Sequence, residues 1–344
     1  MPICIAEATV ECVHALPDPC DPNLNMIEIS HLSKDFAGFK AVDDISFSVG
    51  PGEVLGFLGP NGAGKSTTMK MIAGFLRPSG GYAKVMGYRV SRRPMRAKRE
   101  IGYLPEGAPL YADMTPPDFL EFIASMRGIK RSHRPQAVTR VMRQLELEQV
   151  ANKRIDALSK GFKRRVGIAQ AIIHDPAVLI LDEPTDGLDP NQKHQVRQLI
   201  RTLAKEKIII LSTHILEEVS AVCTRAIVIA EGQIRADDTP GVLQSRSRYH
   251  GAVTLDIKET GVIAAVTTAL QQLDGVADVE VSEEIDGRLT VLPAADAELH
   301  SAVSGLAARH QWPVSALFVE AGRLDDVFRD ITAPTAMADE VKTA

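Results

Sequence analysis

The segment best suited to chemistry is a short glycine-rich stretch that ends in a lysine and two hydroxyl side chains. Residues 59–67 read Gly-Pro-Asn-Gly-Ala-Gly-Lys-Ser-Thr and fit the phosphate-binding pattern G-x-x-x-x-G-K-[ST]. The glycines let the backbone curl so that N–H groups point at phosphate oxygens, and the N-terminus of the following helix adds positive potential. Lys65 can meet the β- and γ-phosphates, and the Ser66 hydroxyl can bind Mg²⁺. The pattern therefore predicts a nucleoside triphosphate site.

A pair of acidic residues supplies the second half of such a site. The apolar run 177–181 has the length of a buried parallel strand, and Asp182 and Glu183 follow it directly. Asp182 is placed to hold the metal, directly or through water. Glu183 is placed to polarise the water that attacks the γ-phosphate. The sequence thus predicts hydrolysis of the nucleotide as well as binding.

The elements that must position these residues alternate between strands and helices. Strand patterns cover residues 27–29, 45–49, 54–58, 177–181, 208–212 and 227–230. Helical patterns lie between the later strands, and this alternation predicts a largely parallel sheet covered on its faces. Residues 114–158 show helical spacing broken by prolines, which indicates a helical insertion.

The C-terminal part of the chain has a different order of elements. Between residues 252 and 320 the patterns run strand–helix–strand–strand–helix–strand, an order typical of a ferredoxin-like module. A last helix is expected at residues 324–331. We interpret this part as an accessory that stabilises a dimer or regulates the protein.

Further motifs follow in a fixed order and resemble those of ABC-family nucleotide-binding domains. Residues 158–161, Leu-Ser-Lys-Gly, resemble the family's signature loop L-S-G-G-Q and lie between the phosphate loop and the acidic strand. Residues 186–189, Asp-Gly-Leu-Asp, resemble the D-loop, and His214 resembles the switch histidine. Glu106 stands where the family usually has the glutamine of its Q-loop. Phe36 stands where an aromatic ring stacks on adenine.

This resemblance covers roughly residues 26–244 and implies an α/β fold, a P-loop NTPase of ABC type. Such a fold has a RecA-like parallel sheet core, an antiparallel β-subdomain and a helical subdomain, and here the C-terminal ferredoxin-like α+β module is added. The implied activity is ATP hydrolysis, with ATP and Mg²⁺ as cofactors.

The resemblance also implies a role for each matching residue. Glu183 and His214 would be catalytic. The residues implied to bind ATP are Phe36, Gly59, Pro60, Asn61, Gly62, Ala63, Gly64, Lys65, Ser66 and Thr67. Ser66, Glu106 and Asp182 would hold the metal. In the signature loop, Ser159, Lys160 and Gly161 would act on ATP held by a second copy of the chain, and Asp189 belongs to the D-loop.

Three positions depart from the family pattern. Lys160 replaces the first glycine of the signature and Phe162 its glutamine, while Ser159 and Gly161 are kept, so we expect the two-copy site to work. Glu106 still offers an oxygen to Mg²⁺ but adds negative charge. The choice of stacking ring stays open as well, because Phe39 lies close enough to replace Phe36.

Two kinds of function compete for such a chain. An ABC transporter subunit would drive a separate integral membrane permease, here of the ABC-2 exporter type that the gliding-motility and drug-export group uses. The alternative is a non-transport ABC ATPase that acts in DNA repair or translation. The short gap between Lys65 and Ser159 and the single nucleotide-binding domain favour the transporter. We expect the protein in the cytoplasm, attached peripherally to the membrane through its permease.

Composition agrees with this interpretation. With 45% hydrophobic and 24% charged residues the chain is of ordinary globular type. The net charge of −5 gives no reason to expect nucleic acid as a partner, and we interpret the basic run 92–99 as a solvated face. Cys4, Cys12, Cys20 and Cys223 form no CxxC pair and are expected to be free thiols.

The predicted division of the chain has four parts. Residues 1–25 form an extension that we expect to be disordered, and residues 26–244 form the nucleotide-binding domain, with its helical subdomain at about 107–165. Residues 245–332 form the C-terminal accessory domain. Residues 333–344 form a flexible tail.

Overall fold

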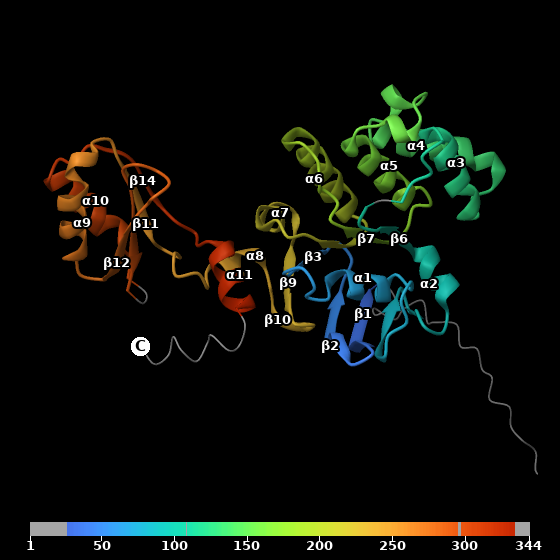
Figure 1. Ribbon diagram of the computed structural model, residues 1–344, viewed down its shortest axis with the longest axis horizontal. Helices are drawn as coiled ribbons and strands as arrows, with labels where there is room; N and C mark the ends of the chain where they lie inside the picture. The colour runs from blue at the N-terminus through green and yellow to red at the C-terminus, as the bar shows by residue number, and fades with distance from the viewer. Residues whose placement is uncertain (1–25, 108, 295–296, 334–344) are drawn as a thin grey trace, which may run out of the picture.

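The computed structural model describes residues 26–107, 109–294 and 297–333, and within them the strands form three sheets (Figure 1). The expected N-terminal extension, residues 1–25, lies outside the described residues together with Cys4, Cys12 and Cys20. All but the first residue of the expected tail, 333–344, lies outside them too. No helix in the described part of the chain is long and apolar enough to span a membrane.

A six-stranded sheet in the order β10-β9-β3-β8-β7-β6 forms the centre of the fold. Its strands are β3 (Val54–Leu58), β6 (Ile101–Leu104), β7 (Val178–Asp182), β8 (Ile208–Ser212), β9 (Arg225–Ala230) and β10 (Gln233–Asp238). Neighbouring strands pair in parallel, except that the edge strand β10 runs antiparallel to β9. Every residue of β3, β7 and β8 is buried, which explains their continuous apolar sequences. The predicted parallel core is confirmed.

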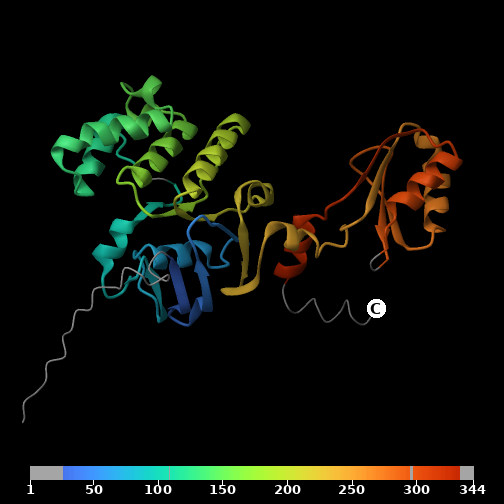
Figure 2. The same ribbon diagram turned by 180° about the vertical axis from the view of Figure 1, so that it is seen from behind.

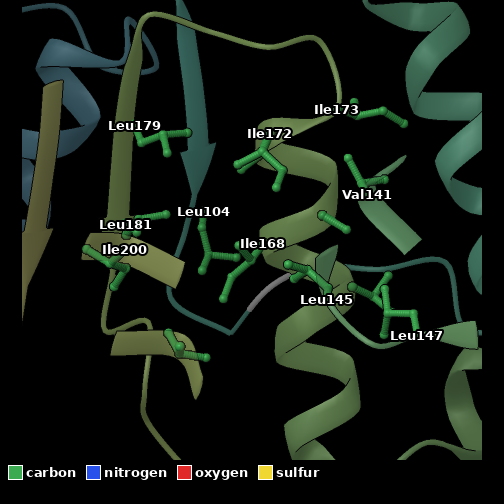
Figure 3. Close-up of a cluster of buried hydrophobic side chains, with 14 of the residues drawn as sticks. Leu104, Val141, Leu145, Leu147, Ile168, Ile172, Ile173, Leu179, Leu181 and Ile200 are labelled. Carbon is green, nitrogen blue, oxygen red and sulfur yellow. The ribbon is translucent and has the colours of Figure 1, made fainter. Parts of the chain in front are cut away.

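One face of this sheet packs on two helices that lie between its strands in sequence. These helices are α5 (Lys160–Ile172) and α6 (Pro190–Ala204). Figure 3 shows Leu104 of β6 and Leu179 of β7 beside Ile168 and Ile172 of α5, and all four belong to one buried cluster. The same cluster extends into the helical insertion, where α3 (Pro116–Met126) and α4 (Arg134–Gln144) lie above the sheet in Figure 1.

The other face packs on the helix of the phosphate loop and on a second sheet. The helix is α1 (Lys65–Ile72). The antiparallel sheet has the order β2-β1-β4-β5, with β1 (Ile27–Phe36), β2 (Phe39–Val49), β4 (Gly80–Val85) and β5 (Tyr88–Arg89). Three shorter helices complete the nucleotide-binding part, namely α2 (Pro94–Glu100), α7 (Leu216–Val222) and α8 (Pro240–Gln244). The fold therefore contains the antiparallel β-subdomain that the family resemblance implied.

The C-terminal module has its own sheet and its own core. Its elements are β11 (Val253–Ile257), α9 (Ile263–Gln271), β12 (Val276–Val281), β13 (Arg288–Pro293), α10 (His300–Arg309) and β14 (Val314–Val319). The strands pair antiparallel in the order β12-β13-β11-β14, the arrangement of a βαββαβ sheet. Its side chains form a separate buried cluster, and Figures 1 and 2 show the module at the end of the molecule opposite α3 and α4.

The last helix, α11 (Leu324–Thr332), returns from this module to the nucleotide-binding part. Leu324 is buried with Ala226 and Val228 of β9 and Leu243 of α8. A polar contact reinforces the return, since the Ser247 hydroxyl donates a hydrogen bond to Asp326 Oδ2 over 2.7 Å. The chain therefore leaves the nucleotide-binding part after α8 and comes back at α11. The domain boundary near residue 244 stays a proposal, to which we add that α11 belongs with the first domain.

The chain segments that enter and leave the module lie side by side. His250 Nδ1 is 2.9 Å from the carbonyl oxygen of Ala321, and the Gly251 N–H donates to the carbonyl of Glu320 over 3.0 Å. The two ends of the segment 251–320 are therefore close enough that we expect His250 and Ala321 to be joinable, with this segment cut out and α11 in place.

We expect this excision to preserve the stability of the nucleotide-binding part, whereas a chain that ends at Gln244 loses stability. The second variant lacks α11, and the buried side chains of Leu324 and Val327 contribute on the order of 2 kcal/mol each. Chemical denaturation of both shortened chains measures the difference in the free energy of unfolding. Equal stability of the two would contradict the proposed place of α11.

Candidate nucleotide site

The phosphate loop joins β3 to α1, and its shape requires glycine at two positions. A Cβ atom on Gly59 would lie 2.4 Å from the carbonyl oxygen of Ile229. Gly64 has a φ of 105° and a Cβ there would lie 2.4 Å from the carbonyl oxygen of Ala41. No side chain fits either place, so the two glycines let the loop pass close to β9 and β2.

A pocket of about 470 Å³ opens over this loop. Its lining residues are Phe36, Phe39, Ala41, Asn61, Gly62, Gly64, Lys65, Ser66, Thr67, Glu106 and Glu183. Phe36 and Phe39 pair with each other where β1 turns into β2, and 47% and 65% of their surfaces are exposed. The structure thus brings most of the predicted nucleotide-binding residues to one cavity and places both candidate rings at its edge.

Lys65 is buried at the floor of the loop. Its Nζ donates hydrogen bonds to the carbonyl oxygens of Gly59 over 2.7 Å and Pro60 over 3.0 Å. Burial lowers the pKa of Lys65, and the carboxylates of Glu183, Asp182 and Glu106 act against that shift. The lysine therefore lies among the acidic groups with its charge directed to the loop.

Asp182 ends β7 with only 2% of its surface exposed. It lies opposite Ser212 in the register of β7 and β8, and the Ser212 hydroxyl donates to its Oδ1. The Ser66 hydroxyl is 3.4 Å from the same oxygen. Among the described residues the buried Oδ2 has no hydrogen-bond partner, which is costly for a carboxylate unless a ligand supplies one.

Glu183 follows in a left-handed backbone conformation, with a φ of 51°. Its N–H donates to Ser212, and its Oε2 lies 2.9 Å from Nδ1 of His214. Burial raises the pKa of the Glu183 carboxyl, and the hydrogen bond from His214 lowers it. The turn thus directs the carboxylate toward the pocket and the histidine.

The signature and D-loop residues lie elsewhere. The Ser159 hydroxyl accepts from the N–H of Phe162 over 3.4 Å and caps α5, and Asp189 accepts from the N–H of Gln192 over 2.9 Å and caps α6. Gly161 lies against the Gln192 side chain so closely that a Cβ would meet it at 2.2 Å. These residues, with Lys160, are absent from the pocket lining of the described chain.

The chain is similar to known proteins in sequence and in fold. Residues 42–186 match the ABC transporter family. The linearmycin resistance ATP-binding protein LnrL of Bacillus subtilis (strain 168) is 31% identical over 311 residues, which cover 90% of this chain and 99% of that protein. The chain belongs to the ABC transporter ATP-binding proteins.

Other ABC proteins agree with this membership. The Nod factor export ATP-binding protein I of Paraburkholderia xenovorans (strain LB400) is 38% identical over 218 residues, covering 63% of this chain and 72% of that protein. A solved ATP-binding subunit of an ABC transporter is 31% identical with a TM-score of 0.60 and covers 64% of this chain and 92% of that one. The predicted ABC fold and ATPase activity are confirmed. The alternative of a non-transport ATPase in DNA repair or translation is not supported.

Two residues of this ABC site were not predicted from the sequence. Ser212 bonds both Asp182 and the N–H of Glu183, and Arg164 donates to the backbone carbonyls of the same turn. Ser212 directly precedes the Thr213–His214 pair at the end of a buried strand, which is a usable signal. Arg164 sits in the basic run after the signature loop, and nothing in its spacing separates it from its neighbours.

The hydrogen bond between Glu183 and His214 predicts a pH effect on hydrolysis. Since His214 lowers the pKa of Glu183, His214→Ala should raise that pKa further. As pH falls through the pKa the carboxylate takes up a proton and stops acting as a base, so the residual turnover of the variant should disappear at a higher pH than that of the parent. Single-turnover rates measured between about pH 5 and 8 test this.

His194→Ala is the matched control, because His194 is exposed on α6 and bonds Gln198 instead of a site residue. Its single-turnover rate should fall at the same acidic pH as the rate of the parent. The contact between His214 and Glu183 would be contradicted if the rate of His214→Ala fell at the same pH as that of the parent or at a lower one.

Proposed function

We propose that two copies of this chain bind ATP and Mg²⁺ between them and that hydrolysis drives a separate permease of the ABC-2 exporter type. One observation carries this proposal. The phosphate loop, Glu106 and Glu183 line one pocket. Asp182 and His214 contact residues of that lining, Asp182 through Ser66 and His214 through Glu183. The signature and D-loop residues Ser159, Lys160, Gly161 and Asp189 neither line the pocket nor have a hydrogen bond to its lining in the described chain. A single copy therefore offers half of a site.

The nucleotide is proposed to lie along the pocket from the aromatic rings to the phosphate loop. Phe36 or Phe39 stacks on adenine, since either ring offers a π-face at the pocket edge. The phosphates meet Lys65 and the backbone N–H groups of residues 61–67. Lys65 would then exchange its hydrogen bonds to the loop carbonyls for phosphate oxygens.

Mg²⁺ fits the oxygen atoms beside the loop. The buried Oδ2 of Asp182 lacks a hydrogen-bond partner in the described chain, the Ser66 hydroxyl adjoins the same carboxylate, and Glu106 lines the same pocket. Hard divalent cations prefer such oxygen ligands. We propose Ser66, Asp182 and Glu106 as the residues that hold it, and the bound ion would neutralise charge on the β- and γ-phosphates.

Glu183 is proposed as the general base and His214 as the residue that orients it. The 2.9 Å contact between the two side chains and the left-handed backbone at Glu183 support this. A raised pKa brings the carboxylate closer to the value at which a base works best near neutral pH.

We expect Glu183→Gln to keep ATP binding while turnover falls roughly a hundredfold or more, because the base is lost and the side-chain size is kept. Unhydrolysed ATP should then hold two copies together, with Ser159 and Gly161 of each facing the nucleotide of the other. Phosphate release measures turnover, and light scattering at saturating ATP measures the mass.

Lys65→Ala is the control for this dimer. It removes the cation for the phosphates, so ATP affinity measured by calorimetry should fall and the Glu183→Gln dimer should not form in the double variant. Turnover of Glu183→Gln close to that of the parent would show that Glu183 is not the base.

The permease is proposed to bind an apolar groove of about 390 Å³ between the sheet and the helical insertion. The groove is lined by Lys70, Phe75, Tyr103, Pro105, Pro109, Ile123, Arg127 and Gln170. Phe75 is 66% exposed there and packs against the Tyr103 ring with the ring centroids 5.2 Å apart, so the two rings form a continuous apolar patch of the kind that binds partners. Pro105 directly precedes Glu106, so an apolar segment of the permease in this groove would touch the chain segment that reaches the nucleotide.

Through this groove the protein would attach peripherally to the cytoplasmic face of the membrane. A charged side chain placed in the groove tests this proposal. Phe75→Asp should reduce binding to inverted membrane vesicles of the source cells stripped of their own ATPase subunits, because the apolar contact is lost. The matched control is Phe318→Asp on β14, since Phe318 is also exposed, at 43%, and lies in the C-terminal module. Equal binding of the two variants would contradict the assignment of the groove.

A further inference from the structure

Arg164 is a buried cation beneath the catalytic turn. It lies on α5, five residues after Ser159, with 7% of its surface exposed. Its guanidinium reaches the end of β7. The backbone carbonyls that accept its hydrogen bonds belong to Asp182 at 2.5 Å, Glu183, Pro184 at 3.3 Å and Pro105 at 3.5 Å.

These carbonyls need a donor because the chain leaves the sheet at this point. β7 ends at Asp182, and the left-handed conformation of Glu183 turns the backbone out of the ladder. Buried carbonyl groups without a partner are costly. A guanidinium suits this place since it presents five N–H donors in a fixed fork.

The charge of Arg164 also suits its surroundings. Burial lowers the pKa of the guanidinium, and the carboxylates of Asp186, Asp182, Glu183 and Glu106 raise it. Four acidic residues of the catalytic region therefore favour the charged form of this buried guanidinium. Glu106 follows Pro105, whose carbonyl is one of the four acceptors.

We infer that Arg164 is a positioning residue for ATP hydrolysis, which holds the turn that directs Glu183 and ties it to the segment that carries Glu106. The inference rests on the proposed function, in which Glu183 is the general base. Within the described residues every hydrogen bond of Arg164 goes to a backbone carbonyl, so it acts through Glu183 and leaves the binding of the phosphates to Lys65.

The neighbouring arginine provides a matched control. Arg165 is also 7% exposed, but its guanidinium bonds the carbonyl of Leu145, Oε2 of Glu146 at 3.2 Å and Oε1 of Gln195. It joins α5 to the helical insertion and to α6. Removal of either arginine takes away one buried cation on the same helix, and only Arg164 touches the catalytic turn.

The experiment compares Arg164→Met, Arg164→Lys and Arg165→Met in the full-length protein. We expect Arg164→Met to lower kcat by about 10–100-fold, as loss of a supporting contact to a catalytic group typically does, with ATP affinity within a few-fold of the parent. Arg164→Lys keeps the positive charge but lacks the forked guanidinium. Its kcat should lie between that of Arg164→Met and that of the parent. Arg165→Met should keep kcat near that of the parent at a similar loss of stability.

Three results would overturn the inference or its basis. Parental kcat in Arg164→Met while Glu183→Gln is inactive refutes the positioning role and leaves the proposed function intact. Equal losses of kcat in Arg164→Met and Arg165→Met also refute it, because general packing would then explain both. If Glu183→Gln stays active, the proposed function itself fails. Should Arg164→Met not fold, Arg164→Lys decides the question by the same comparison of kcat with ATP affinity.

Discussion

The buried carboxylate of Asp182 is the constraint on which the rest of the site depends. A carboxylate removed from water is unstable unless donors surround it. Its donors come from two other segments of the chain, Ser212 at the end of β8 and Ser66 at the start of α1. A shift of one residue between β7 and β8 would turn Asp182 to the other face of the sheet. The position of the acidic pair therefore depends on both the strand register and the phosphate loop.

Opposite charges around this carboxylate have distinct tasks. Lys65 bonds the phosphate loop and is the cation that we propose for the nucleotide, whereas the hydrogen bonds of Arg164 to described residues go to backbone carbonyls at the end of β7. Glu106, where the family usually has glutamine, adds a negative charge near the proposed metal ligands. This charge favours the charged forms of Lys65 on α1 and Arg164 on α5 by raising the pKa of each.

The sequence predicted those parts of the site that lie within continuous motifs. Residues 59–67 match a phosphate-loop motif in which glycines are required for the backbone conformation. Asp182 and Glu183 follow a strand that is recognisable from its continuous apolar sequence. The roles of Ser212 and Arg164 could not be predicted, since they depend on which side chains reach the end of β7 once strands and helices have packed. The packing of α11 against the nucleotide-binding part could not be predicted for the same reason. Its pattern predicts a helix, but a helical pattern does not say which of two neighbouring cores receives it.

The return of α11 links the C-terminal module to the nucleotide-binding part through the entropy of the chain. If the module unfolds while α11 stays bound, the roughly 70 residues between His250 and Ala321 become a flexible loop with fixed ends. Closing a loop of that length costs on the order of 3–4 kcal/mol by the (3/2)RT ln n dependence. A folded module holds its two ends together and removes this cost. The module can therefore strengthen the binding of α11 to β9 without contacting the nucleotide pocket, and anything that loosens the module weakens that binding.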